Sequence, residues 1–306
     1  MSSPWIEALR SVALNVPDLA AAEAFYTGTW HLDVAAREPG VLYLRGTGAD
    51  AYLLALHAGG PPVQLREVTL RARSADALAA IAAAAVRAGG RVLQPAAPLQ
   101  APGGGQALLL CDGDGRRFQI VHGDALNADA QEAKDRPLRL AHTVLNSHDV
   151  AATQRFLEQA LGFTLADRTR IMAFMNCNRD HHSIALGDAD NDALNHIAFL
   201  MPDLDSVMRG GGRMKDAGFA IEWGPGRHGP GDNAFNYFVG PFGEVIEYTA
   251  EVEQIDDSYR AGGPADWTWP PGRLDHWGIT PGPSPRVKAA QRRFAFSADG
   301  YRLERS

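Results

Sequence analysis

Short apolar runs that read as strands alternate along this chain with segments in which apolar residues recur at helical spacing. Residues 10–16 read as a strand, Asp18 can cap a helix, and helical spacing follows over residues 19–26. The same order returns about 130 residues later, with a strand at residues 141–146 and helical spacing over residues 150–157. This repetition indicates that one structural unit is used twice.

The correspondence between the two halves continues beyond these first elements. The matched segments are residues 65–70 and 194–199, residues 74–88 and 203–217, and residues 114–121 and 242–248. The first pair reads as strands, the second as capped helices, and the third as strands that follow a turn. The sequence therefore predicts two copies of a unit of about 120 residues, each built from two βαβββ modules.

Three consecutive glycines, Gly210 to Gly212, interrupt the helical pattern of residues 203–217. Together they cost a helix roughly 3 kcal/mol relative to alanine. We therefore expect a break or a kink at this point of the helix.

Composition narrows the class of protein. The chain has 306 residues, of which 45% are apolar and 21% charged, as in an ordinary globular protein of two domains. Its formal net charge of −7 argues against a nucleic-acid partner. Two cysteines, Cys111 and Cys177, make a disulfide scaffold or a cysteine zinc site a poor expectation. The N-terminus has no signal-peptide pattern, and no run approaches the ~18–20 apolar residues that cross a bilayer, so we expect a cytoplasmic protein without a membrane partner.

Three residues of the second half, His142, His196 and Glu247, each lie on an apolar segment that reads as a strand. A lone histidine on a strand is more often a core residue than a ligand. In combination, however, two imidazoles and one carboxylate can hold one face of an octahedral Fe(II) ion and leave positions open for O2 and a substrate. Burial also requires each of these polar groups to have a partner.

The internal repeat offers a control on this interpretation. The positions equivalent to the three candidate ligands are Ser11, Glu67 and Gln119 in the first half. They include no histidine, although core packing makes similar demands on both halves. The comparison favours a metal site and places a single metal in the second copy.

The chain resembles the type I extradiol ring-cleaving dioxygenases of the vicinal oxygen chelate superfamily, which also includes glyoxalases and bleomycin-resistance proteins. The resemblance covers roughly residues 5–280 and is more specific in the second half. It implies an α+β fold of tandem βαβββ modules, in which two vicinal-oxygen-chelate domains each form a curved, partly closed sheet around a cavity. It also implies iron bound by His142, His196 and Glu247.

The same resemblance gives the domains their roles. Residues 1–125 correspond to a vestigial N-terminal domain without metal, and residues 138–280 to the catalytic metal-binding domain. Residues 125–137 form a polar, charged junction between them. The sequence from residue 251 onward has no counterpart in the first half, and residues 281–306 are assigned to a C-terminal tail.

Family members place an acid/base histidine on a strand shortly before the second ligand. Two adjacent residues, His181 and His182, fall in that region. Because successive strand residues face opposite sides of a sheet, only one of them should face the metal. His182 matches the family context better, so the resemblance implies that it is the acid/base, and His181 is kept as a substrate contact.

The loop at residues 224–237 is the most family-specific run in the chain, and its glycines permit a tight approach to a ligand. The resemblance implies catalytic roles for His228, which closes a loop over the site, and for Tyr237, which hydrogen-bonds a substrate oxygen. Asn233 of the same run is a further candidate substrate contact. In the tail, Arg273 corresponds to an arginine that meets an acidic substituent of the substrate in some relatives.

One position departs from the family pattern. Some relatives carry a polar residue two positions after the first ligand, near the oxygen site, and here that residue is Val144. Oxygen activation would therefore depend more on His182.

The predicted function is extradiol cleavage of a catechol-type substrate by O2 at Fe(II), in aromatic-compound catabolism, with Mn(II) as the alternative metal. Resemblance also implies a homo-oligomer, a tetramer or larger. Two other classes stay open at this stage. A metal-dependent isomerase or lyase of the same superfamily would not consume O2 and would normally draw ligands from both halves. A metal-free small-molecule-binding protein would not need the two histidines and the glutamate.

Overall fold

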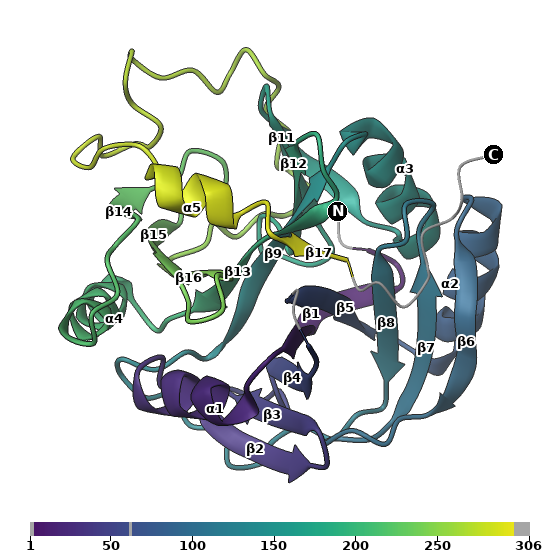
Figure 1. Cartoon of the computed structure of the whole chain (residues 1–306). Helices are drawn as coiled ribbons and strands as arrows, with labels where there is room; N and C mark the ends of the chain where they lie inside the picture. The colour runs from purple at the N-terminus through teal and green to yellow at the C-terminus, as the bar shows by residue number, and fades with distance from the viewer. Residues whose placement is uncertain (1–2, 61–62, 297–306) are drawn as a thin grey trace.

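Two sheets with the same strand order contain most of the chain (Figure 1). The computed structural model describes residues 3–60 and 63–296, so the last ten residues of the predicted tail lie outside the described residues. The strands of the first sheet are β1 (Ile6–Val16), β2 (Asp33–Glu38), β3 (Val41–Arg45), β4 (Leu54–Ala58), β5 (Gln64–Ala72), β6 (Arg91–Pro98), β7 (Gln106–Cys111) and β8 (Arg117–His122). Those of the second are β9 (Arg139–Ser147), β10 (Thr164–Arg168), β11 (Met172–Asn176), β12 (Ile184–Asp188), β13 (Ala193–Leu200), β14 (Trp223–Arg227), β15 (Ala234–Val239), β16 (Val245–Ala250) and β17 (Phe294–Ala295).

Each sheet consists of two βαβββ modules, which confirms the predicted architecture. The first sheet runs β2-β3-β4-β1-β5-β8-β7-β6, and the second runs β10-β11-β12-β9-β13-β16-β15-β14. Within every module the first strand lies parallel to the last, as β1 does to β4 and β13 does to β16. The two modules of a sheet join through one antiparallel pair, β1 with β5 or β9 with β13.

The first four helices, α1 to α4, begin where the sequence places their caps. The helices are α1 (Leu19–Gly28), α2 (Ala75–Arg87), α3 (Val150–Leu161), α4 (Leu204–Asp216) and α5 (Pro285–Ala290). Asp18, Ser74, Asp149 and Asp203 each accept a hydrogen bond from a backbone N–H in the first turn of the helix that follows. None of the helices in the described part of the chain is both long and apolar enough to span a bilayer.

The pairing register confirms that the three first-half positions are equivalent to the three candidate ligands. Ser11 pairs with Thr69 in the first sheet as His142 pairs with Ala198 in the second. Glu67 pairs with Ala13 as His196 pairs with Val144. Gln119 pairs with Thr69 as Glu247 pairs with Ala198. The repeat therefore holds in three dimensions as well as along the sequence.

The expected break at the three glycines is wrong, because α4 continues through Gly210 to Gly212. The glycines allow α4 to pack closely on the second sheet, beside β15 and β16. A Cβ on Gly210 would lie 2.7 Å from the Tyr248 ring, and one on Gly211 would lie 2.9 Å from the Asn236 amide nitrogen. Helix propensity alone predicts a break, and packing outweighs it here.

Alanine substitutions separate these two effects. Gly210→Ala should lower the free energy of unfolding by about 1–3 kcal/mol, because the added methyl overpacks against Tyr248. Gly212→Ala should raise it by up to ~1 kcal/mol, because that glycine is exposed and its Cβ would meet nothing within 4 Å. Urea denaturation of both variants measures the difference. Equal stabilisation by the two alanines would show that close packing of α4 is not the reason for Gly210.

Residues of the first half of the chain pack directly against the second sheet. The ring of Trp30, which follows α1, stacks on Tyr248 of β16 with centroids 3.7 Å apart. The Tyr248 hydroxyl donates to the Trp30 carbonyl at 2.8 Å, and the Tyr26 hydroxyl donates to Glu244 Oε1 at 2.7 Å. These contacts hold β16 against α1 and the residues that follow it.

Burial raises the pKa of Glu244 to about 7, from an ordinary value of 4.5. Because the unfolded chain loses this proton first, the protonated Glu244 contributes stability fully below pH 4.5 and loses it as the pH rises through 7. The free energy of unfolding should fall across that window by on the order of 3 kcal/mol. Unfolding as a function of pH should show this slope in wild type and in the exposed control Glu132→Gln, but not in Glu244→Gln. An unchanged slope in Glu244→Gln would contradict the assignment.

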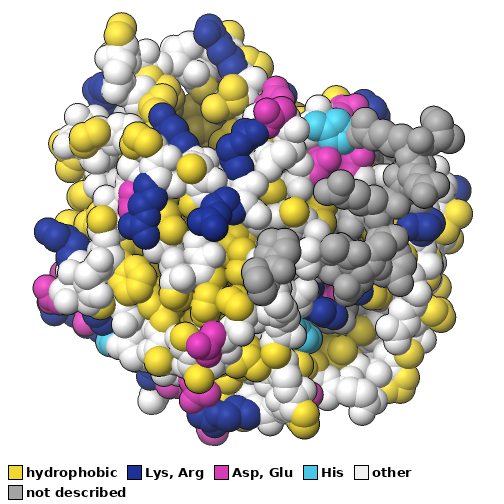
Figure 2. Space-filling model, viewed as in Figure 1, with side chains coloured by type: hydrophobic (Ala, Val, Ile, Leu, Met, Phe, Trp, Pro, Cys, Tyr) yellow, Lys and Arg dark blue, Asp and Glu magenta, His cyan; other side chains and the backbone are white. Residues whose placement is uncertain are grey.

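The segment after β16 wraps the second half and returns to the sheet as α5 and β17. Figure 2 shows Lys and Arg side chains gathered on the face around α5. Arg286 of α5 pairs with Glu222 at 2.9 Å, and Arg292 pairs with Asp190. Residues Ala193 and Leu194 of β13 pair with β17, which connects this segment to a strand that carries a candidate ligand.

Candidate metal centre

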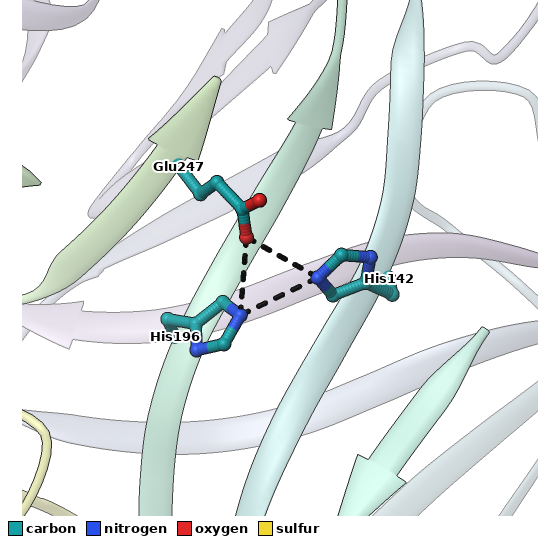
Figure 3. A group of neighbouring side chains, drawn as sticks. All are labelled: His142, His196 and Glu247. Carbon is teal, nitrogen blue, oxygen red and sulfur yellow. Dashed lines mark hydrogen bonds and ion pairs between the residues drawn. The ribbon is translucent and has the colours of Figure 1, made fainter. Parts of the chain in front are cut away.

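The three candidate ligands come from three neighbouring strands, β9, β13 and β16, and their side chains converge (Figure 3). Glu247 Oε2 lies 3.2 Å from His142 Nε2 and 3.2 Å from His196 Nε2. The two imidazole nitrogens are 3.4 Å apart. All three side chains are buried. The strand order places the residues side by side although they are far apart in sequence.

This arrangement fits a divalent metal ion. Ligand bonds of about 2.1 Å give an octahedron with edges of about 3 Å, close to the distances between the three donor atoms. Among the described residues, the buried Glu247 Oε2 has no hydrogen-bond partner of good geometry. A buried carboxylate oxygen without such a bond is costly, and a cation between the three groups would satisfy it.

A neighbouring amide orients one candidate ligand, His196. His196 Nδ1 lies 2.8 Å from Asn195 Oδ1, and Asn195 Nδ2 donates to Asn146 Oδ1 at 2.8 Å. The second bond turns the Asn195 carbonyl oxygen toward His196, so His196 carries its proton on Nδ1 and presents a bare Nε2 to the centre. Sequence reasoning misses Asn195, because consecutive strand residues should face opposite sides. A register irregularity between Leu194 and His196 removes that alternation.

The charge states of the candidate ligands suit a metal. Burial lowers the pKa of His196 to about 4, which keeps its imidazole neutral. Burial opposes ionisation of Glu247, but His142 and His196 outweigh it and hold the pKa of this carboxyl well below its usual range. A neutral imidazole and a carboxylate are the forms that bind a divalent cation.

His182 lies beside the centre, with its ring centroid 4.3 Å from that of His142. The expectation that His181 and His182 alternate along a strand is wrong, because both precede β12, which begins at Ile184. Both rings are buried, and their Nδ1 atoms are 3.0 Å apart. Within the described residues, His182 Nε2 has no hydrogen-bond partner, so it is the ring nitrogen left for a bound molecule.

Tyr237 and His228 line another side of the centre. The Tyr237 hydroxyl lies 3.0 Å from His228 Nε2 and 3.4 Å from His196 Nε2. Burial, together with the charge of Glu247, raises the pKa of Tyr237 well above its usual range, so the phenol keeps its proton. The structure therefore brings together the predicted ligands, His182, Tyr237 and His228.

The three remaining predicted substrate contacts each have protein partners. Asn233 Nδ2 donates to Thr249 Oγ1 at 2.7 Å and lies 3.5 Å from Glu247 Oε1, which places this amide behind a ligand. Both ring nitrogens of His181 are within hydrogen-bond distance of protein atoms. The Arg273 guanidinium donates to the carbonyls of two tail residues, and no described contact joins it to the three ligands.

The equivalent positions of the first sheet hold ordinary polar contacts. Ser11 Oγ accepts from Arg10 at 3.4 Å, Glu67 lies 4.0 Å from Arg117, and the Gln119 amide oxygen lies 3.5 Å from the Thr69 hydroxyl. No group of potential ligands among the described residues includes these positions.

A second group of potential ligands bridges the two halves, at Asp114, His148 and Asp192. Its two aspartates already pair with a buried arginine, because Arg116 lies 2.9 Å from Asp114 and 2.5 Å from Asp192. His148 Nδ1 is 2.7 Å from Asp192 Oδ2. This group forms an ion-pair network between the sheets.

Replacing Ser11, Glu67 and Gln119 together with alanine should leave the bound metal at one ion per chain. The reason is that all the candidate ligand atoms lie in the second sheet. The free energy of unfolding should fall by about 1–3 kcal/mol, because buried hydrogen-bonding groups lose partners. Metal analysis checks the first expectation and urea denaturation the second. Two ions in wild type, or loss of the single ion in this variant, would contradict the one-site interpretation.

Known proteins share this fold and part of this sequence. The family model of the Glyoxalase/Bleomycin resistance protein/Dioxygenase superfamily matches residues 139–248. The crystal structure of a Mn(II)-bound glyoxalase from Novosphingobium aromaticivorans is 32% identical, covers 94% of each chain and gives a TM-score of 0.85. Homoprotocatechuate 2,3-dioxygenase from Arthrobacter globiformis is 21% identical over 98% of this chain and 95% of its own, with a TM-score of 0.83. Metapyrocatechase 2 from Cupriavidus necator is 34% identical over 139 residues, which are 44% of this chain and 41% of that protein.

This chain belongs to the Glyoxalase/Bleomycin resistance protein/Dioxygenase superfamily. The 32% identity to the glyoxalase structure extends over both halves, whereas the match to metapyrocatechase 2 spans only 41% of that relative. The fold predicted from the resemblance is confirmed.

Proposed function

We propose that this chain is an extradiol dioxygenase, which opens the ring of a catechol-type diol beside its two hydroxyls and places both atoms of O2 in the product. One observation carries the proposal: His142, His196 and Glu247 converge on one point, with His182 and Tyr237 beside it. Two imidazoles and one carboxylate leave a metal with open positions, which suits a reaction of two small molecules. The similarity to metapyrocatechase 2 supports the same class of substrate.

The metal we propose is Fe(II), held by His142, His196 and Glu247, and Mn(II) suits the same ligands. It would supply adjacent binding positions for a diol and O2 and a path for electrons between them. Tyr237 keeps its hydroxyl proton beside His196 and is placed to donate a hydrogen bond to a diol oxygen. The His182 ring lies beside His142, with ring centroids 4.3 Å apart, and its Nε2 can accept a hydroxyl proton and return it to the opened product.

An apolar wall next to His182 completes the site. Val144, Phe174 and Ala185 form a buried cluster against which Met172 packs. The Phe174 ring meets the His182 ring edge-on, with centroids 5.1 Å apart. Such a wall excludes water and suits an aromatic ring or O2. Val144, the departure from the family pattern, belongs to this wall.

A second candidate is a metal-dependent isomerase or lyase. The observation that favours it is the 32% identity, over 94% of both chains, to a structure described as a Mn(II)-bound glyoxalase. The distribution of ligands favours the dioxygenase, because the candidate set lies wholly within the second sheet.

Oxygen consumption distinguishes the two candidates. Protein loaded with Fe(II) under argon is offered a panel of catechols in an oxygen electrode, while absorbance is recorded. The dioxygenase proposal expects one O2 consumed per ring opened, a yellow product, and no turnover under argon. Turnover of a substrate at an equal rate with and without O2 would instead support the isomerase or lyase.

A further inference from the structure

Behind His182 lies a fully buried carboxylate that accepts several hydrogen bonds. Asp167 is near the end of β10, and its Oδ2 lies 2.8 Å from His181 Nε2 and 2.9 Å from the Tyr259 hydroxyl. Its other oxygen, Oδ1, accepts the backbone N–H of Gly262. The proposed reaction does not use this aspartate directly. A buried charge of this kind is costly unless its neighbours compensate it.

The hydrogen bonds between His182 and this carboxylate are all donated in one direction, toward the carboxylate. An ionised carboxylate can only accept, so His181 carries its proton on Nε2 and, as a neutral imidazole, has a bare Nδ1. His182 Nδ1 lies 3.0 Å from that atom and must therefore be the donor. His182 then has its proton on Nδ1 and a bare Nε2, the nitrogen that has no partner among the described residues.

We propose that Asp167 and His181 are positioning residues, which fix His182 in the tautomer that can accept a proton from the substrate. The proposal rests on the proposed function for its catalytic consequence, but the tautomer itself does not depend on which reaction occurs. It also changes the role of His181, which supports His182 from behind and does not contact the substrate.

The same arrangement gives part of the segment after β16 a role. Tyr259 and Gly262 both donate to Asp167. The backbone N–H of His181 donates to the Glu253 carbonyl at 2.9 Å, which satisfies a buried main-chain donor. Residues 253–262 therefore hold Asp167 and His181, from which the series of hydrogen bonds reaches His182.

The substitution Asp167→Asn tests the proposal with little change of shape. Because the Gly262 N–H must keep an acceptor, the new amide should leave its oxygen there and turn its NH2 toward His181. His181 would then accept at Nε2 and donate from Nδ1, and His182 would carry its proton on Nε2. Tyr259→Phe is the matched control, because it removes one bond to the same carboxylate and leaves the order of donors unchanged.

The tautomers can be read by two-bond 1H–15N spectra of protein labelled at histidine, with diamagnetic Zn(II) in the metal site. We expect His182 to be protonated on Nδ1 in wild type and in Tyr259→Phe, and on Nε2 in Asp167→Asn. With Fe(II), kcat for catechol cleavage should fall about 10–100-fold in Asp167→Asn alone, with KM and metal content unchanged. A wild-type His182 protonated on Nε2, or one unaffected by Asp167→Asn, would overturn the proposal. Absence of catechol cleavage in wild type would count against the proposed function only, because the spectra still report the tautomer.

Discussion

Alanine in place of His142, His196 or Glu247 should abolish metal binding and ring cleavage together. Each residue supplies one of three donor atoms that lie 3.2–3.4 Å apart, so any one replacement leaves only two ligands. We expect metal content below about a tenth of an ion per chain at micromolar free Fe(II), and loss of kcat by more than about 10³-fold. Metal analysis after desalting, followed by assay with added Fe(II), measures both.

The first sheet provides a matched control for this experiment. Gln119 occupies the position equivalent to Glu247, with the same strand pairing, so Gln119→Ala removes a comparable side chain away from the proposed metal. This variant should keep one ion per chain and its activity. A full complement of iron in any of the three ligand variants would remove that residue from the ligand set.

Replacing His182 with phenylalanine should slow turnover by about 10²–10⁴-fold and leave the metal in place. The change removes the proton acceptor at Nε2 but keeps an aromatic ring beside His142 and Phe174. Because the metal ligands are untouched, the main effect should fall on kcat, with a smaller effect on KM. Steady-state kinetics and metal analysis of the same preparation are the measurements.

His181→Phe is the comparison for His182→Phe. His181 acts through its neighbour, so its loss should slow turnover less, by about 10–100-fold. If His181→Phe proved the more damaging substitution, the assignment of His182 as the proton acceptor would be wrong.

The sequence is most informative where it can be compared with itself. The repeat predicts the modules and the equivalence of Ser11 with His142, and the strand register confirms both. Because period-two alternation and helical caps are local signals, they also locate the strands and helix starts well. The three candidate ligands can be chosen because the same positions in the other copy lack imidazoles.

Sequence reasoning fails where contacts distant in sequence decide the outcome. Local propensity predicts a break at Gly210, but the Tyr248 ring explains why glycine is needed within an intact helix. Strand alternation does not apply to His181 and His182, which lie outside β12. The role of Asp167 depends on Tyr259 and Gly262, which no local pattern connects to it.

The most direct test of the central claim is the fate of labelled oxygen. Protein loaded with Fe(II) is mixed with a cleavable catechol under 18O2, and the product is analysed by mass spectrometry before its carbonyl oxygen exchanges with water. The account predicts a ring-opened product that carries two labelled oxygen atoms, and no product from protein in which Glu247 is replaced with alanine. A ring-opened or rearranged product that carries no labelled oxygen would contradict it.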